Sequence, residues 1–171
     1  MNREINKPAE WESEGGAGCA ATSGVVVAPA EPRDVVKIGA LLQAAGLPHC
    51  DLASSGAKFL VARDGAGRVV GAVGAEVHAP DALLRSLVVA PESRGLGLGV
   101  ELVRRLDAAA AEWGVERWWL LTTTAERFFL DRGFSVAPRT SAPQVIAATG
   151  QFTGGCSSLA VCLTRARRVK R

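Results

Sequence analysis

The stretch "SLVVAPESRGLGLGVELVRRL", Ser86–Leu106, decides the fold of this chain. Apolar residues that favour strands end at Pro91, an arginine and alternating glycines follow, and apolar residues at helical spacing then begin. Gly95, Gly97 and Gly99 stand where the strand gives way to the helix, although each glycine adds to the entropy lost on folding. We infer that the backbone is left bare there so that a ligand can approach it.

A strand, a glycine-rich loop and a helix in this order are typical of a phosphate site. The first turn of a helix holds N–H groups without intrahelical partners, and the helix dipole adds partial positive charge. Arg94 can add a charge-assisted contact. The stretch lacks both the Gly-Lys-Ser/Thr of a Walker sequence and the spacing of a dinucleotide-binding fingerprint. The residues predict a phosphate site over 94–100, with a plain strand–helix turn as the alternative.

The composition bounds the class of protein. The chain has 171 residues, of which 48% are apolar, enough for one domain with a sizeable core. We see no run of roughly 18 apolar residues, the length of a membrane-spanning helix. Residues 1–24 lack the apolar core of a signal peptide and are expected to form a flexible tail, as is the basic segment 166–171. We therefore expect one cytoplasmic domain over 25–165, with neither a nucleic-acid nor a membrane partner.

Apolar periodicity predicts alternating strands and helices, hence an α/β or α+β domain around one mixed sheet. Strands are expected at 24–29, 59–63, 69–78, 83–89, 116–124, 134–138 and 157–165, and helices at 31–46, 98–113, 125–133 and 141–152.

The cysteines show no metal-binding spacing. Cys19, Cys50, Cys156 and Cys162 form no C-x-x-C pair, so small buried thiols and no metal site are expected. A soft-metal or arsenite site built from Cys50, Cys156 or Cys162 is the alternative.

Charged residues on two predicted strands are candidates for catalysis. Glu76 and His78 have the same parity, so they share a face and are expected to act as a base or to bind an amine; an exposed strand end is the alternative. Arg85 lies in an otherwise apolar strand and needs an anionic partner. That partner is either Glu76 or, as we favour, the anionic group of an acidic substrate. Further candidates for substrate contact are Ser86, Arg139 and Arg33.

Two segments resemble the GCN5-related N-acetyltransferases, the GNAT family. Arg94–Gly99 resembles the signature Q/R-x-x-G-x-G/A, and residues 122–134 resemble the segment N-x-x-A-x-x-L-Y-x-x-x-G-F. The order of elements over 25–165 fits as well. The resemblance implies acetyl-CoA as co-substrate, no metal, and a mostly antiparallel sheet of six to seven strands that splays between the fourth and fifth strands.

The resemblance also implies roles for backbone groups. The amides of Arg94, Gly95, Leu96, Gly97, Leu98, Gly99 and Val100 would hold the pyrophosphate. The backbone of Leu87, Val88 and Val89 would pair with the pantetheine arm, and an amide near Val88 or Val89 would stabilise the thioester oxyanion. At two positions that would contact the cofactor the chain departs from the family: Thr122 replaces the usual asparagine, and Phe129 replaces the tyrosine that often protonates the leaving thiolate. Since the chain has no tyrosine, water or another group must supply that proton.

A narrower resemblance is to the arsenic-resistance N-acetyltransferases. It is carried by Leu120–Phe129, Arg139, Ala142, Pro143, Ile146, Thr149, Gln151, Phe152 and Cys156. It implies detoxification of a glutamate-like organoarsenical such as arsinothricin. Residues 156–160 depart from the C-P-x-S-A expected there. The alternatives are a general small-amine or protein N-acetyltransferase and a non-catalytic protein that binds acetyl-CoA or a thiol-bound arsenical; a homodimer is also open.

Overall fold

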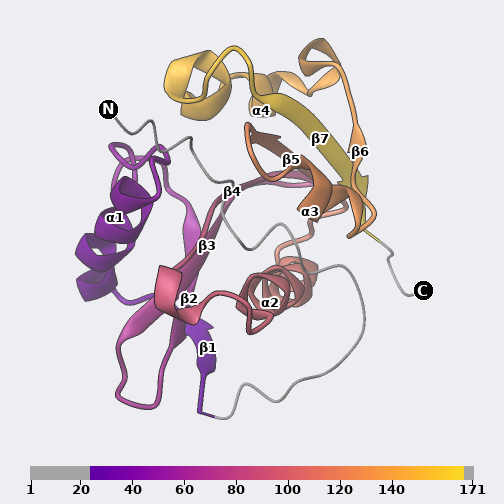
Figure 1. The fold of residues 1–171 in the computed structure, drawn as a ribbon. Helices are drawn as coiled ribbons and strands as arrows, with labels where there is room; N and C mark the ends of the chain where they lie inside the picture. Colours follow the sequence, from indigo (N-terminus) through magenta and orange to yellow (C-terminus); the bar gives the residue numbers. More distant parts are fainter. Residues whose placement is uncertain (1–23, 168–171) are drawn as a thin grey trace.

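The computed structural model describes residues 24–167 and consists of a seven-stranded sheet with helices on both faces (Figure 1). The order in the sheet is β1-β2-β3-β4-β5-β7-β6. β4 and β5 run parallel, and the other neighbours run antiparallel. The predicted mixed, mostly antiparallel sheet is confirmed. The strands are β1 (Val26–Pro29), β2 (Lys58–Arg63), β3 (Val69–His78), β4 (Asp81–Val89), β5 (Arg117–Thr122), β6 (Ser135–Val136) and β7 (Val161–Ala166).

The helices match the prediction except in the last third of the chain. They are α1 (Val35–Ala44), α2 (Leu98–Glu112), α3 (Glu126–Leu130) and α4 (Gln144–Ala147), with short turns η2 (Pro32–Asp34), η3 (Pro91–Ser93), η4 (Arg139–Ser141) and η5 (Gln151–Gly155). The single helix predicted over 141–152 is wrong. Ala142 is extended, as the residue before a proline tends to be, so α4 begins only after Pro143. Gly154, at φ 153°, then interrupts η5.

The two faces of the sheet carry separate cores. On one face Ile38 and Leu42 of α1 pack against Val61 and Val88, and Ile146 of α4 packs near them against Leu83 and Trp119. On the other face, Leu102 and Leu106 of α2 and the phenylalanines of α3 pack against Leu60, Val73 and Leu84. α1 and α4 therefore cover one face, and α2 and α3 cover the other (Figure 1).

A bulge interrupts β4 in its middle. Gly74 pairs with Arg85 and Ala72 with Val88, so Ser86 and Leu87 both stand opposite Val73. Ser86 has φ 58°, the one positive value among the non-glycine residues 24–167. The extra residue reverses the alternation of side chains: Leu84 faces α2 before the bulge, and Val89 does so after it.

The bulge coincides with a gap in the sheet. β5 pairs with β4 only at Asp81–Leu83, opposite Arg117–Trp119. Beyond this point β5 pairs with β7 alone, up to Thr122. The splay implied by the family resemblance is confirmed, and it leaves one edge of Leu84–Val89 unpaired with β5.

The ends of the predicted domain can be compared only in part. Residues 1–23 and 168–171 lie outside the described residues, as does Cys19, so both predicted tails stay predictions there. β7 continues to Ala166, and the Arg167 guanidinium donates to the carbonyls of Val115 and Asp107. Among residues 24–167, every helix is too short or too polar to cross a bilayer.

Candidate functional site

Two cavities lie along the unpaired edge of β4. The larger, of about 680 Å³, is bordered by the loop after α1, the gap between β4 and β5, and the segment after α4. Its lining includes His49, Cys50, Asp51, Ser86, Leu87, Thr122, Phe129, Gly150, Gln151 and Cys156. The smaller lies at the N-terminus of α2 and is lined by Val89, Ser93, Arg94, Gly95, Gly97, Leu98, Gly99, Val100 and Phe128.

The glycine loop shapes the smaller cavity. Gly95 and Gly97 have φ of 77° and 73°, a left-handed conformation that favours glycine, and Gly97 precedes α2 directly. The Glu101 amide donates to the Gly97 carbonyl at 3.0 Å, so the amides of residues 98–100 precede the first intrahelical bond of α2. The predicted residues 94–100 all line this cavity except Leu96, which is exposed.

Strand register identifies the amides that face the gap. The Ala90 amide donates to the Val70 carbonyl at 2.8 Å, so by alternation Val88 also directs its backbone groups toward β3. Leu87 and Val89 then direct theirs toward the gap. The Val89 carbonyl fits this direction, because it accepts a hydrogen bond from Arg94 Nε at 3.0 Å. Of the two residues predicted for the oxyanion amide, the register favours Val89 over Val88 and adds Leu87.

Thr122 and Phe129 both line the larger cavity. The Thr122 hydroxyl accepts a bond from the Ala125 amide at 2.8 Å and keeps its own O–H to donate. Phe129 is buried and packs edge-to-face with Phe128 and Phe134. The position that usually holds tyrosine is thus at the cavity, but its side chain supplies no proton.

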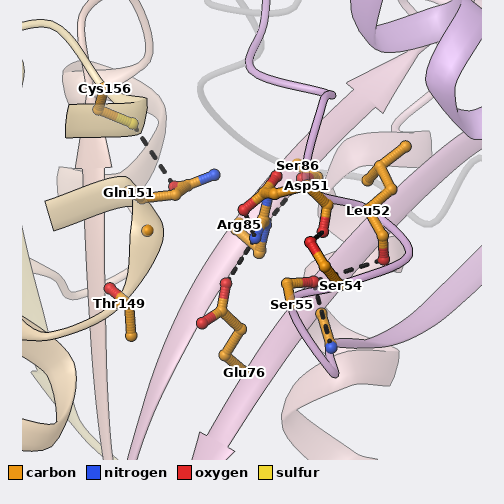
Figure 2. Close-up of polar contacts among 12 residues, drawn as sticks. Asp51, Leu52, Ser54, Ser55, Glu76, Arg85, Ser86, Thr149, Gln151 and Cys156 are labelled. Atoms are coloured by element: carbon orange, nitrogen blue, oxygen red, sulfur yellow. Dashed lines mark hydrogen bonds and ion pairs between the residues drawn. The ribbon is translucent and has the colours of Figure 1, made fainter. Parts of the chain in front are cut away.

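A buried guanidinium organises the other side of the larger cavity (Figure 2). The Arg85 side chain has no exposed surface. Its Nη1 donates to Asp51 Oδ2 at 2.7 Å and to Glu76 Oε1 at 2.5 Å, and its Nη2 donates to Asp51 Oδ1 at 2.5 Å. Its Nε donates to Ser86 Oγ at 3.2 Å. The favoured expectation, that the anionic group of a substrate would pair with Arg85, is thus not met: the alternative, Glu76, is a partner, and Asp51 is a second one.

Gln151 completes the set of acceptors around Arg85. With its amide oxygen turned toward Arg85, Gln151 accepts from Nε and Nη2, each at 3.3 Å. The atom drawn as the amide oxygen in Figure 2, which lies 3.5 Å from Cys156 Sγ, is then the amide nitrogen. All five guanidinium N–H groups therefore have acceptors within the protein, and none is left for a substrate anion.

The electrostatics of this cluster fix its protonation. Hydrogen bonds from Arg85 lower the pKa of Asp51, outweighing burial, which raises it. Burial lowers the pKa of Arg85, but the bonds to Asp51 and Glu76 more than reverse this, and its pKa is raised. At neutral pH Asp51 is thus a carboxylate and Arg85 a guanidinium cation.

The side chains of His78, Arg139 and Arg33 are not among the residues that line the two cavities. His78 is exposed at the end of β3, next to the turn into β4, so the expected Glu76–His78 pair does not line the larger cavity. Arg139 donates from Nη2 to the carbonyls of Ser157 and Ala160. Arg33 is exposed and pairs with Glu31.

Sequence reasoning missed His49, Asp51 and Gln151. Asp51 lies in a loop of no recognisable motif, and its signal in the sequence is indirect. A buried arginine requires anions, and within the chain the sequence pointed only to Glu76. The His49 ring Nδ1 lies 3.0 Å from the Leu47 carbonyl, so that nitrogen carries the proton and Nε2 is the acceptor.

The described cysteines fall into two environments. Cys50 and Cys156 line the larger cavity, whereas Cys162 is buried in the core. Burial raises the pKa of the Cys156 and Cys162 thiols. Within residues 24–167 no three His, Cys, Asp or Glu side chains are grouped so that they could hold a metal ion.

Comparison with known proteins identifies this architecture. Residues 55–136, from before β2 to the end of β6, match the family described as acetyltransferase (GNAT) domain. Residues 55–136 therefore have the sequence of a GNAT acetyltransferase domain. The match includes the bulged β4, the glycine loop and α2. The GNAT resemblance is therefore confirmed for this domain.

Individual relatives agree with the GNAT fold. A segment of 48 residues is 44% identical to part of an amino-acid acetyltransferase of Ralstonia nicotianae. This segment makes up 28% of this chain and 11% of that protein. The N-acetylglutamate synthase of Neisseria gonorrhoeae, solved with coenzyme A and N-acetyl-glutamate, superposes with a TM-score of 0.71 at 22% identity, over 85% of this chain and 35% of that one. Rv2747 of Mycobacterium tuberculosis, solved in complex with CoA, superposes with a TM-score of 0.69 at 22% identity, over 82% of this chain and 98% of that one. The chain thus spans about a tenth of the first relative and a third of the second.

Proposed function

We propose that this chain is an acetyl-CoA-dependent N-acetyltransferase that acts on the amine of a small amino-acid-like acceptor. The observation that supports this proposal is the course of β4. The strand stops pairing with β5 after Leu83, has a bulge at Ser86, and is followed by the glycine loop at the N-terminus of α2. One strand thus joins an anion cradle to a chamber with unpaired backbone amides. The GNAT domain and the amino-acid acetyltransferase relative support the reaction class.

The cradle fits the pyrophosphate of acetyl-CoA. The amides of residues 98–100 and the dipole of the 15-residue α2 favour negative charge there. Space for the phosphates comes from Gly95 and Gly97, since a Cβ built on either would meet no atom within 4 Å. When bound, acetyl-CoA supplies the activated acetyl group, and the open edge of Leu87–Val89 would hold the pantetheine arm.

The residues around the larger cavity can place an amine beside that thioester. Asp51 offers a carboxylate for the incoming ammonium, and His49 Nε2 is a free acceptor for its proton. The neutral amine nitrogen then forms a bond to the thioester carbon and gives up its second proton to water. The carbon–sulfur bond breaks, and water protonates the leaving thiolate in place of the missing tyrosine. The Leu87 and Val89 amides face the developing oxyanion. Placement is the chain's main contribution to the rate.

The test is thiol release from acetyl-CoA by the purified chain. The panel is glutamine, glutamate, methionine sulfoximine, phosphinothricin, arsinothricin, polyamines and a lysine peptide, with coenzyme A binding measured alongside by calorimetry. Turnover of amino-acid-like amines is the expected result. Tight binding of acetyl-CoA with no thiol release from any amine would overturn the proposal in favour of a binding protein.

The glutamate-like organoarsenical is a second, narrower candidate. The fold likeness to a synthase solved with N-acetyl-glutamate favours an acidic amino-acid acceptor, and the sequence resemblance to the arsenic-resistance enzymes supplies the arsenical. Against it stands the loss of Arg85 as an anion receptor, because that guanidinium is enclosed. Arsinothricin turnover well above that of the other amines would establish this candidate.

A further inference from the structure

The charges around Arg85 do not balance. Arg85 contributes one positive charge, and Asp51 and Glu76 contribute two negative charges within hydrogen-bond distance. Glu76 is enclosed, with 7% of its side chain exposed, whereas 35% of the Asp51 side chain is exposed. The excess negative charge is therefore exposed to the larger cavity at Asp51.

Asp51 is the only carboxylate among the described residues that line the larger cavity. The described residues that line it include no lysine or arginine, and the other ionisable side chains there are His49, Cys50 and Cys156. Arg139 does not line the cavity, although its charge lowers the pKa of the Cys156 thiol against the larger effect of burial, and its guanidinium is bonded to the Ser157 and Ala160 carbonyls. Burial raises the pKa of Cys156, so its thiol stays neutral and adds no charge.

Space is left beside the exposed carboxylate. A Cβ built on Gly150 would lie 3.4 Å from Asp51 Oδ2, so the absence of a side chain at Gly150 leaves that oxygen open. Gly150 has φ −55°, a conformation that any residue adopts, so the backbone does not require glycine there.

We propose that Asp51, positioned by Arg85, binds the acceptor ammonium and makes the site select amines that carry no acidic side chain. The acceptor class is thus a neutral or cationic amino-acid-like amine, rather than a glutamate analogue. This inference rests on the proposed acetyl transfer for its kinetic readout. A second anion in the acceptor would approach the uncompensated charge at Asp51, where like charges in a partly enclosed cavity repel strongly.

Glutamine and glutamate test the proposal, because they share a shape and differ in one charge. We expect kcat/KM for glutamine to exceed that for glutamate by roughly tenfold or more. A preference for glutamate would overturn the inference while leaving the proposed acetyl transfer standing. Turnover of no amine would overturn the proposed function, and calorimetric titration of the same pair into the coenzyme A-loaded chain then decides the inference alone. Equal binding of the two, or binding of neither, would overturn it.

Asp51→Asn tests whether Asp51 causes the preference for glutamine over glutamate. The substitution keeps the shape and one acceptor for Arg85, so we expect KM for glutamine to rise and the glutamine-to-glutamate ratio to fall to about one. The matched control is Asp64→Asn, which removes a charge from another arginine-paired aspartate in the turn between β2 and β3, where neither cavity lies. A ratio unchanged in Asp51→Asn, or changed equally in Asp64→Asn, would overturn the role of Asp51.

Gly150→Ala provides a second variant that leaves every charge in place. The added methyl contacts Asp51 Oδ2 at the edge of normal van der Waals distance, so the fold is retained while the space beside the carboxylate is filled. We expect KM for glutamine to rise severalfold with kcat changed less. An unchanged KM would show that the acceptor does not approach Asp51 from this side.

Discussion

The two ends of the site are built from different parts of the chain. The end that faces coenzyme A consists of backbone groups in one continuous stretch, Leu87–Val100, shaped by two left-handed glycines and a helix N-terminus. The acceptor end consists of side chains from the loop after α1, β3, β4 and η5, and its central pair, Asp51 and Arg85, is 34 residues apart.

This difference determines whether a substitution at each end weakens ligand binding or destabilises the fold. Backbone amides keep their direction as long as the local φ and ψ values hold, whatever the surrounding side chains. The acceptor end holds its shape only while charges balance, because Arg85 is enclosed and its partners are fixed by it. Substitutions should therefore damage binding at one end and folding at the other.

Arg85→Met should have the largest effect and should act on stability. It leaves Glu76 buried, and Asp51 beside it, without a countercharge, so we expect the free energy of unfolding to fall by about 3–5 kcal/mol. Urea denaturation measures the change. Adding Glu76→Gln to the same chain should recover part of the loss, because the buried carboxylate is then gone. A loss that this second substitution does not reduce would mean that Arg85 stabilises through packing alone.

Gly97→Val should come next and should act on binding. A β-branched residue at φ 73° is strained, and relief of that strain would turn the amides of residues 98–100 away from the cradle. We expect coenzyme A affinity to fall by roughly a hundredfold by calorimetry, about the loss of two charge-assisted hydrogen bonds.

Gly67→Val is the matched control for that loss. Gly67 has φ 78° in the turn between β2 and β3, so the backbone strain is similar while the cradle is untouched. Equal losses of coenzyme A affinity in both variants would mean that destabilisation, rather than the cradle, explains the effect.

The same contrast explains what could be predicted from the sequence. The glycine loop, the central strand and α2 were all predictable, because each depends on residues adjacent in the chain: alternating glycines, apolar runs and a helical period. The splay between β4 and β5 came from the family resemblance. The bulge carries no local residue signal, since Ser86 is an unusual residue to adopt a positive φ.

For the acceptor end, the sequence predicted that Arg85 requires a partner but not which loop residues supply one. Arg85 in an apolar strand requires an anion, and Glu76 follows from strand pairing nine residues away. Asp51 and Gln151 reach the same guanidinium through loops, whose paths depend on tertiary packing. The helix predicted over 141–152 failed for a related reason. Pro143 delays its start, α4 ends at Ala147, and the segment that follows presents Gln151 to Arg85.

Asp51→Asn should have a smaller, pH-dependent effect on stability. The pKa of Asp51 is lowered by bonds from Arg85, so its contribution is present above the unfolded value near 3.8 and is lost as pH falls through the folded value. At pH 7 we expect a loss of about 1 kcal/mol, reduced by partial exposure to solvent. The stability gap to the parent chain should stay level down to about pH 4 and close below it. A gap that persists at pH 2 would show that charge is not the cause.

Phe129→Tyr should have the smallest effect and should act on chemistry alone. The ring already lines the larger cavity, so a hydroxyl added to it places a proton donor in the chamber where the thiolate leaves. Because water protonates that thiolate in the proposed mechanism, we expect kcat to rise only roughly threefold, far less than a general acid gives where no other donor is present.

The pH profile separates this gain from a change in packing. A donor with a phenol pKa should extend activity toward alkaline pH, whereas better packing would raise kcat equally at every pH. Coenzyme A affinity should stay within about twofold, since the cradle is built from backbone and the ring keeps its edge-to-face contacts with Phe128 and Phe134. An unchanged kcat with unchanged affinity would show that thiolate protonation does not limit turnover. The replacement of tyrosine would then be neutral, because the rate depends on how the acceptor end places the amine.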